Sequence, residues 1–271
     1  MPIHPTAIIS PQTEIDPTAQ IGPYVVIDDE VKIGPNCRIF PHVFINGYTT
    51  IGANNEIHSG AVIGDSPQDL AFKPCRSYVR IGDNNVIREG ATIHRGSTPE
   101  SETVIGNHCY LMANSHIAHN CRLADHVKLA NGVLLAGHVH IEEGSFLSGN
   151  SAVHQFTRIG RLCMISGNSR VTMDVPHFMI VYGNSDVIGI NRVGLKRAGF
   201  TSSQITDIRA AYRFIWRGAM NFSKAVEQLA KENSSPEVKE LLDFIRTPSK
   251  RGIAGPPRES RTTGKNNDEN D

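Results

Sequence analysis

Aliphatic residues recur at every sixth position along the first two thirds of this chain. From Ile3 to Ile63 each sixth residue is isoleucine, and between positions 3 and 171 Ile, Leu or Val occupies 26 of the 29 positions in this phase. The period matches neither the 3.6 residues per turn of an α-helix nor the two-residue alternation of a half-buried strand. The chain must therefore return one side chain of every hexad to a common interior.

Two further positions of the hexad are also regular. Four residues after each aliphatic stands a small or β-branched residue, such as Ala7 or Thr13, and glycine often follows the aliphatic directly, as at Gly22 and Gly34. This pattern is typical of hexapeptide solenoids, in which each hexad forms one short strand and one corner of a triangular prism. We predict a mainly β fold, a left-handed parallel β-helix with three hexads in each coil. Residues three hexads apart then stack about 4.8 Å above one another.

Three positions interrupt the aliphatic series. Asp69, Cys75 and Pro99 break it, and their neighbours are rich in Ser, Pro and charged residues. We therefore expect two loops, at 66–80 and 97–104, that leave the coil and rejoin it in phase.

The period changes to that of a helix in the last third of the chain. A capping-box pattern at 201–204 precedes stripes of apolar residues at helical spacing. We predict a β-helix over 1–176, a connecting segment and α-helical C-terminal domain over 177–252, and a disordered tail over 253–271.

Composition excludes several classes of function. With 27 basic and 27 acidic residues, the chain lacks the positive field with which nucleic-acid-binding proteins attract phosphates. The sequence contains no run of about 18 apolar residues, which is the length needed to span a membrane. Its N-terminus does not resemble a secretion signal. Four of the five cysteines fall at the small-residue position of the hexad, without a CxxC pair. We expect a cytoplasmic protein with no disulfides, no nucleic-acid partner and no membrane span.

Stacking of successive coils brings several polar groups to one edge of the prism. His119 should lie below Gly137 and Gln155 above it, while His138 lies over Asn120. These groups favour a functional site, whereas histidines at other corners fit an ordinary role as polar turn residues. Strand alternation predicts outward-facing side chains on the prism faces for His94, His116, His140 and His154.

Three kinds of function fit this cluster to different degrees. A neutral imidazole beside a glycine amide offers a general base and an oxyanion donor, which acyl transfer to a hydroxyl or amine requires. A zinc lyase of the carbonic anhydrase type is the second choice, because that family places two histidines five apart on one strand, whereas His116 and His119 are three apart. A purely structural or binding solenoid would leave the local density of histidines unused.

Six short motifs, in this order, make the chain similar to one family. They are HRG at 94–96, NSHIAHNC at 114–121, LAGHV at 135–139, SAVHQF at 151–156, DVP at 174–176 and GLKRAGF at 194–200. The chain resembles the acyl-acyl carrier protein:UDP-N-acetylglucosamine O-acyltransferases of lipid A biosynthesis, to about residue 252. The related N-acyltransferases carry an extra N-terminal uridine-binding domain, which we do not expect in this chain because its hexads begin at Ile3.

The resemblance implies a mechanism. His119 would be the general base that takes the proton from the sugar 3-position as it attacks the thioester of acyl carrier protein, and the Gly137 amide would hold the oxyanion. The residues implied to bind the sugar nucleotide or the pantetheine arm are Asp69, His116, His138, His154, Gln155, Asn191 and Arg197. Met164 and Gly167 would line the acyl groove. The resemblance also implies a homotrimer with the site between neighbouring prisms, and no metal or organic cofactor.

Three positions depart from the family's pattern. Asn120 follows the base where the family usually has Asp, Ala71 stands where Lys often follows the Gln-Asp-Leu of the first loop, and Val193 replaces an acidic residue. Because these positions surround the acceptor, N-acylation of a 3-amino sugar analogue is the alternative to O-acylation.

Acyl carrier proteins are acidic, so the resemblance also implies a basic docking surface. Six basic residues near the C-terminal domain are candidates for this surface: Arg158, Arg161, Arg170, Arg192, Lys196 and Arg197.

Overall fold

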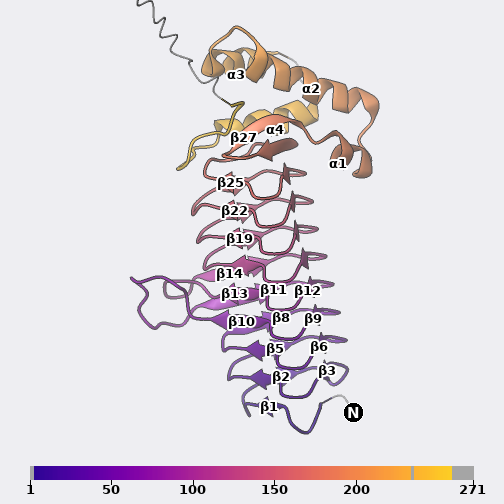
Figure 1. Cartoon of the computed structure of the whole chain (residues 1–271), viewed down its shortest axis with the longest axis vertical. Coiled ribbons are helices and arrows are strands. Elements are labelled where there is room, and N and C mark those ends of the chain that lie inside the picture. Colours follow the sequence, from indigo (N-terminus) through magenta and orange to yellow (C-terminus); the bar gives the residue numbers. More distant parts are fainter. Residues whose placement is uncertain (1–2, 233–234, 258–271) are drawn as a thin grey trace, which may run out of the picture.

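The computed structural model describes residues 3–232 and 235–257, which form a column of short strands with helices at one end (Figure 1). Three sheets run along the column. Sheet 1 contains β1 (Ile8–Ile9), β4 (Val26–Ile27), β7 (Phe44–Ile45), β10 (Val62–Asp65), β13 (Thr92–His94), β16 (His116–Ile117), β19 (Leu134–Leu135), β22 (Ala152–Val153) and β25 (Arg170–Val171). Sheet 2 contains β2 (Glu14–Ile15), β5 (Lys32–Ile33), β8 (Thr49–Ile51), β11 (Tyr78–Ile81), β14 (Glu102–Ile105), β17 (Arg122–Leu123), β20 (His140–Ile141) and β23 (Arg158–Ile159). Sheet 3 contains β3 (Gln20–Ile21), β6 (Arg38–Ile39), β9 (Glu56–Ile57), β12 (Val86–Ile87), β15 (Tyr110–Leu111), β18 (Lys128–Leu129), β21 (Phe146–Leu147), β24 (Met164–Ile165), β26 (Met179–Tyr182) and β27 (Asp186–Ile190).

Strand register follows the hexad count. Ile8 pairs with Val26, three hexads later, as predicted for one coil. Across the first loop the spacing grows to five hexads, from Val62 to Thr92, and across the second to four, from Thr92 to His116. Both loops thus add whole hexads, which is why the aliphatic series resumes in phase after each of them.

The interior of the column is narrow and apolar. Aliphatics in the six-residue phase, such as Ile57 and Ile117, are fully buried. Cys109, Cys121 and Cys163 fill the small-residue positions, and burial raises their thiol pKa values to about 11, 12 and 12. All five cysteines are free thiols.

The corners require a left-handed backbone. Residues such as Asn84, Asn120 and His138 have φ values of 58°, 60° and 60°. Asn and His tolerate this region better than most residues. These recurring corners turn the chain from one sheet to the next.

The C-terminal part ends the column and packs against it. Antiparallel β27 covers β26 at the end of sheet 3. It is followed by α1 (Arg192–Arg197), α2 (Ser202–Arg217), α3 (Phe222–Lys231) and α4 (Pro236–Arg246). The predicted capping box is present between Thr201 and Gln204. No helix within the described ranges is long and apolar enough to cross a membrane.

The segment after α4 returns to the column. The Asp174 N–H donates to the Gly252 carbonyl, and the Ala254 N–H donates to the Asp174 carbonyl, both at 2.8 Å. Ala254 is fully buried. The predicted tail boundary at 253 is therefore too early, because a small apolar residue pairs with the exposed end of the column; residues 258–271 lie outside the described residues.

Candidate functional site

The edge between sheets 1 and 2 carries the predicted cluster. The His138 N–H donates to the His119 carbonyl at 3.0 Å, and the Phe156 N–H donates to the Gly137 carbonyl at 3.1 Å. Residues three hexads apart therefore lie on successive coils. The predicted stacking of His119, Gly137 and Gln155 along one edge is confirmed.

The His119 ring lies directly against the backbone of Gly137. A methyl group built on Gly137 would lie 2.5 Å from Cε1 and 2.6 Å from Nε2 of His119. Only glycine leaves the ring this position. The Gly137 N–H has no acceptor within the described part of the chain. A basic imidazole nitrogen and an unused amide donor thus lie side by side, as acyl transfer requires.

Asn120 contacts the other side of the His119 ring. Its Oδ1 lies 2.9 Å from His119 Nδ1 and accepts hydrogen bonds from the Ser97 N–H at 3.0 Å and the Ser97 hydroxyl at 2.9 Å. The Asn120 N–H donates to Thr103 Oγ1 at 2.8 Å. The second loop, which contains Ser97, thereby supports the edge from outside the coil.

His138 extends the cluster upward along the same edge. Its ring centroid lies 5.2 Å from that of His119, edge to face, and 4.7 Å from that of Phe156, on which it stacks. Lys250 Nζ lies 4.5 Å from the centre of the Phe156 ring. Burial lowers the pKa of His138, the charges of His119 and Lys250 add to this, and the Asp69 carboxylate opposes it. These effects favour the neutral form of His138.

His116 lies on sheet 1 beside His94. Its Nδ1 is 2.7 Å from Thr92 Oγ1, and the two histidine rings meet edge to face at 4.9 Å. Burial lowers the pKa of His116; burial, with the charge of His116, lowers the pKa of His94 to about 4. His94, which was predicted to project from a prism face, is only 4% exposed. Both inserted loops leave the coil at this level, after β10 and β13.

The other residues predicted for the acceptor side are exposed. His154 Nδ1 lies 3.2 Å from the carbonyl of Gln155 on the same edge. Asp69 Oδ1 accepts from the Ala71 N–H at 2.9 Å within the first loop. Its charge acts on His138, so the first loop faces the histidine cluster.

The remaining predicted residues lie elsewhere on the chain. A cavity of about 870 Å³ beside α1 and sheet 3 is lined by Met164, Asn191, Val193 and Arg197, among others. Asn191 caps α1: its Oδ1 accepts from the Gly194 N–H and its Nδ2 donates to the Leu162 carbonyl. In a triangular prism, sheet 3 is opposite the edge between sheets 1 and 2. A single chain therefore does not bring this cavity and His119 together.

Comparison with known proteins shows which family has this arrangement. The family model described as UDP N-acetylglucosamine O-acyltransferase, domain 2, matches residues 174–254, and that of bacterial transferase hexapeptide repeats matches 30–65 and 102–137. The chain is 47% identical over 245 residues to the acyl-[acyl-carrier-protein]--UDP-N-acetylglucosamine O-acyltransferase of Gloeothece citriformis, which covers 90% of this chain and 89% of the relative. The chain belongs to the UDP-N-acetylglucosamine O-acyltransferase family.

Solved structures of this family have the same fold. The Francisella novicida UDP-N-acetylglucosamine acyltransferase is 38% identical with a TM-score of 0.89, over 94% of this chain and 95% of that one. The Moraxella catarrhalis UDP-N-acetylglucosamine O-acyltransferase is 39% identical with a TM-score of 0.89, over 94% and 100%. The predicted family is confirmed, as is the left-handed parallel β-helix followed by a helical C-terminal part.

Two members of the predicted basic surface are neutralised in this acyltransferase-family chain. Arg158 Nε pairs with the buried Asp174 carboxylate at 2.7 Å. Arg161 makes two hydrogen bonds of 2.7 Å to the Glu240 carboxylate on α4. Arg158 also donates to the Thr247 carbonyl at 3.2 Å, so both arginines hold the column to the C-terminal part. The candidates that stay exposed are Arg170, Arg192, Lys196 and Arg197.

The family assignment favours acyl transfer over the zinc-lyase interpretation. Across 3–232 and 235–257, no three His, Cys, Asp or Glu side chains are grouped to hold a metal ion.

Sequence reasoning missed three residues of the site. Ser97 and Thr103 support Asn120, and Lys250 reaches Phe156 from the C-terminal segment. Thr103 lies on β14 at a small-residue position of the hexad, but the period does not show that its hydroxyl contacts Asn120. Ser97 lies in a loop and Lys250 in the segment after α4, so the hexad period carries no signal for these two.

Proposed function

We propose that this chain moves an acyl group from acyl carrier protein to the 3-position of UDP-N-acetylglucosamine, the first step of lipid A biosynthesis. The reaction is the one for which its relatives are named. The observation that carries the proposal is the contact between the His119 ring and the Gly137 backbone, which unites a base and an amide donor. We place the reaction in the cytoplasm.

The proposed chemistry uses the two groups in sequence. His119 Nε2 accepts the proton of the sugar 3-hydroxyl as its oxygen attacks the thioester carbonyl carbon. The Gly137 N–H stabilises the negative charge that forms on the carbonyl oxygen. The carbon–sulfur bond then breaks, and the thiol leaves with the proton held by His119. His116, His138, His154, Gln155 and Asp69 would hold the sugar and its nucleotide along the same edge.

The complete site would lie between two copies of the chain in a homotrimer. Support comes from the separation within one chain, since Met164, Asn191 and Arg197 line a cavity on sheet 3 while His119 lies on the opposite edge. A neighbouring copy related by threefold rotation would present its sheet 3 to that edge. The cavity would hold the acyl chain or the pantetheine arm, with Gly167 at the adjoining corner.

Product mass spectrometry tests the proposal. Purified protein is offered hydroxyacyl or plain acyl carrier protein with UDP-N-acetylglucosamine or its 3-amino analogue. We expect ester formation with the hydroxyl sugar, and a rate at least about 10³-fold lower in His119→Ala. His42→Ala, at a corner of an early coil, is the control and should keep the activity. Full activity of His119→Ala would refute the assigned base, and product from the amine alone would change the acceptor.

A further inference from the structure

We propose that Asn120 sets the tautomer of His119: its side-chain oxygen holds the proton on Nδ1 and leaves Nε2 free to act as the base. Only the kinetic consequence rests on the proposed function. The position of the proton is a property of the folded chain alone.

The orientation of the Asn120 amide follows from its neighbours. A backbone N–H can only donate, so the Asn120 atom that lies 3.0 Å from Ser97 N must be the carbonyl oxygen. The Ser97 hydroxyl donates to the same atom at 2.9 Å. The reversed amide would direct its NH₂ group at the Ser97 N–H and would lose both bonds.

The orientation of the amide decides the proton on the imidazole. His119 Nδ1 lies 2.9 Å from this oxygen and must donate to it. A neutral imidazole carries one proton, so Nε2 has a free lone pair. Nε2 is also the nitrogen next to the Gly137 backbone, where the reacting hydroxyl would lie. Free imidazole side chains in water favour the opposite tautomer, so this contact selects the less common form.

The support of Asn120 is rigid and comes from the second loop. The left-handed corner fixes its backbone at φ 60°, and its N–H is bonded to Thr103 Oγ1. The loop that supplies Ser97 is itself closed by a hydrogen bond of 3.1 Å from the Thr98 N–H to Ser101 Oγ. The hexad inserted at the second loop is not needed to build the column. It would instead serve to hold the Asn120 side chain in place.

Nitrogen NMR of the full chain with ¹⁵N-labelled histidine rings reads the tautomer directly. At about pH 8 we expect the His119 Nε2 signal at the unprotonated position, assigned by its absence in His119→Gln. Asn120→Gly removes the acceptor without strain at the left-handed corner and should shift the ring toward the Nε2–H form. Asn120→Asp retains the acceptor and should retain the wild-type pattern. Asn84→Gly, at a corner with φ 58° on another edge, is the matched control.

Kinetics on the same variants tests the consequence. We expect kcat to fall about 10²-fold in Asn120→Gly with little change in KM, and to be restored in Asn120→Asp. A protonated Nε2 in the wild type, or a tautomer unchanged in Asn120→Gly, would overturn the inference. If the wild type makes no ester, the proposed function fails, and the NMR result still decides the tautomer.

Discussion

The His119 ring occupies the space next to Gly137 Cα. Replacing Gly137 with alanine therefore tests the geometry of the site by adding a single methyl group. In Gly137→Ala the new Cβ would meet Cε1 and Nε2 and displace the ring from the amide. We expect kcat/KM to fall by about 10²-fold, since base and oxyanion donor would no longer be aligned. Steady-state kinetics checks this.

Gly149→Ala is the matched control for this substitution. Gly149 stands at the same hexad position on another edge, and a methyl group there would come no closer than 3.3 Å to the Asn131 carbonyl. It should leave kcat/KM nearly unchanged. Wild-type activity in Gly137→Ala would mean that the ring is not aligned by this contact.

The residues predicted correctly at the edge share one property. His119, Gly137 and Gln155 are spaced by three hexads, so the repeat alone places them above one another. Ser97 and Lys250 reach the site from a loop and from the segment after α4. Their paths depend on tertiary contacts that no local period encodes. The burial of His94 was missed for the same reason, because the loops were expected but not their course.

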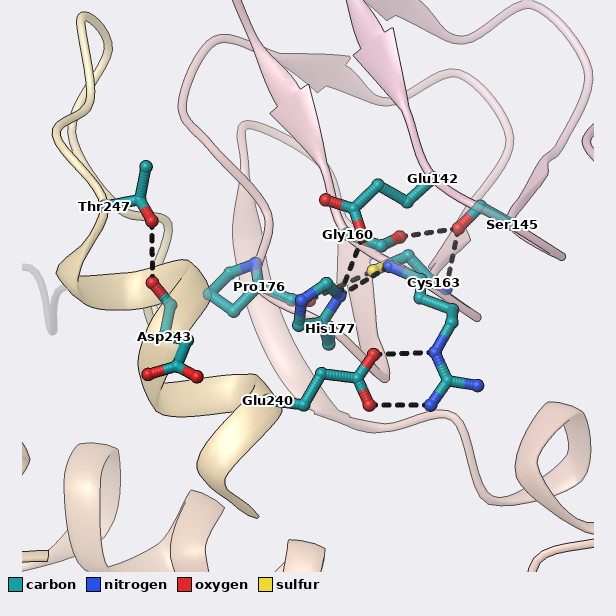
Figure 2. Close-up of polar contacts among 10 residues, drawn as sticks. Glu142, Ser145, Gly160, Cys163, Pro176, His177, Glu240, Asp243 and Thr247 are labelled. Carbon is teal, nitrogen blue, oxygen red and sulfur yellow. Dashed lines mark hydrogen bonds and ion pairs between the residues drawn. The ribbon is translucent and has the colours of Figure 1, made fainter. Parts of the chain in front are cut away.

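At the scale of elements, the junction between the column and α4 depends on a buried histidine. His177 Nδ1 accepts from the Arg161 N–H at 2.7 Å and lies 3.5 Å from a Glu142 carboxylate oxygen (Figure 2). Its ring meets Phe244 of α4 at 4.8 Å. Burial lowers the pKa of His177 to about 4, while Glu240 opposes the shift. The neutral ring is therefore part of the folded junction.

This burial makes the stability of the junction dependent on pH. Between pH 6.5 and 4 the unfolded chain binds a proton at His177 that the folded chain does not, so stability is lost as pH falls. The loss is at most about 3 kcal/mol for a shift of this size. In His177→Asn, whose oxygen can still accept from the Arg161 N–H, we expect a weaker fall of the urea midpoint between pH 7 and 5. An unchanged pH dependence would exclude His177 as its source.

The helices differ in how clearly the sequence predicts them. The capping box at Thr201 and the stripe of Ile205, Ile208 and Ile215 predict α2, whose stripe is buried as expected. The sequence does not mark α1, because a helix of under two turns is too short for a periodic stripe. Its position is set by the Asn191 cap and by burial of Leu195.

At the scale of the whole molecule, the separation of the two groups of site residues predicts complementation between chains. His119→Ala and Arg197→Glu damage opposite sides of the proposed composite site, and each should be inactive alone. Co-expressed in equal amounts, the two variants should regain about one quarter of wild-type activity, because a random trimer pairs two intact sides with that frequency. Mixed trimers, verified by native mass spectrometry, that stay inactive would contradict a site shared between copies.

The three-hexad coil also gives the molecule a fixed unit of length. Heights along the column differ in steps of about 4.8 Å, so a group can be raised on its own edge only by whole coils. Removing a complete early coil would shorten the column by one step and leave every edge facing as before. Removing a single hexad from the coil itself would turn everything beyond the cut by a third of a revolution and move His119 to another corner. The height of a group along the column and the edge on which it lies are therefore set separately. The number of complete coils before the group sets its height, and the number of hexads left over sets its edge.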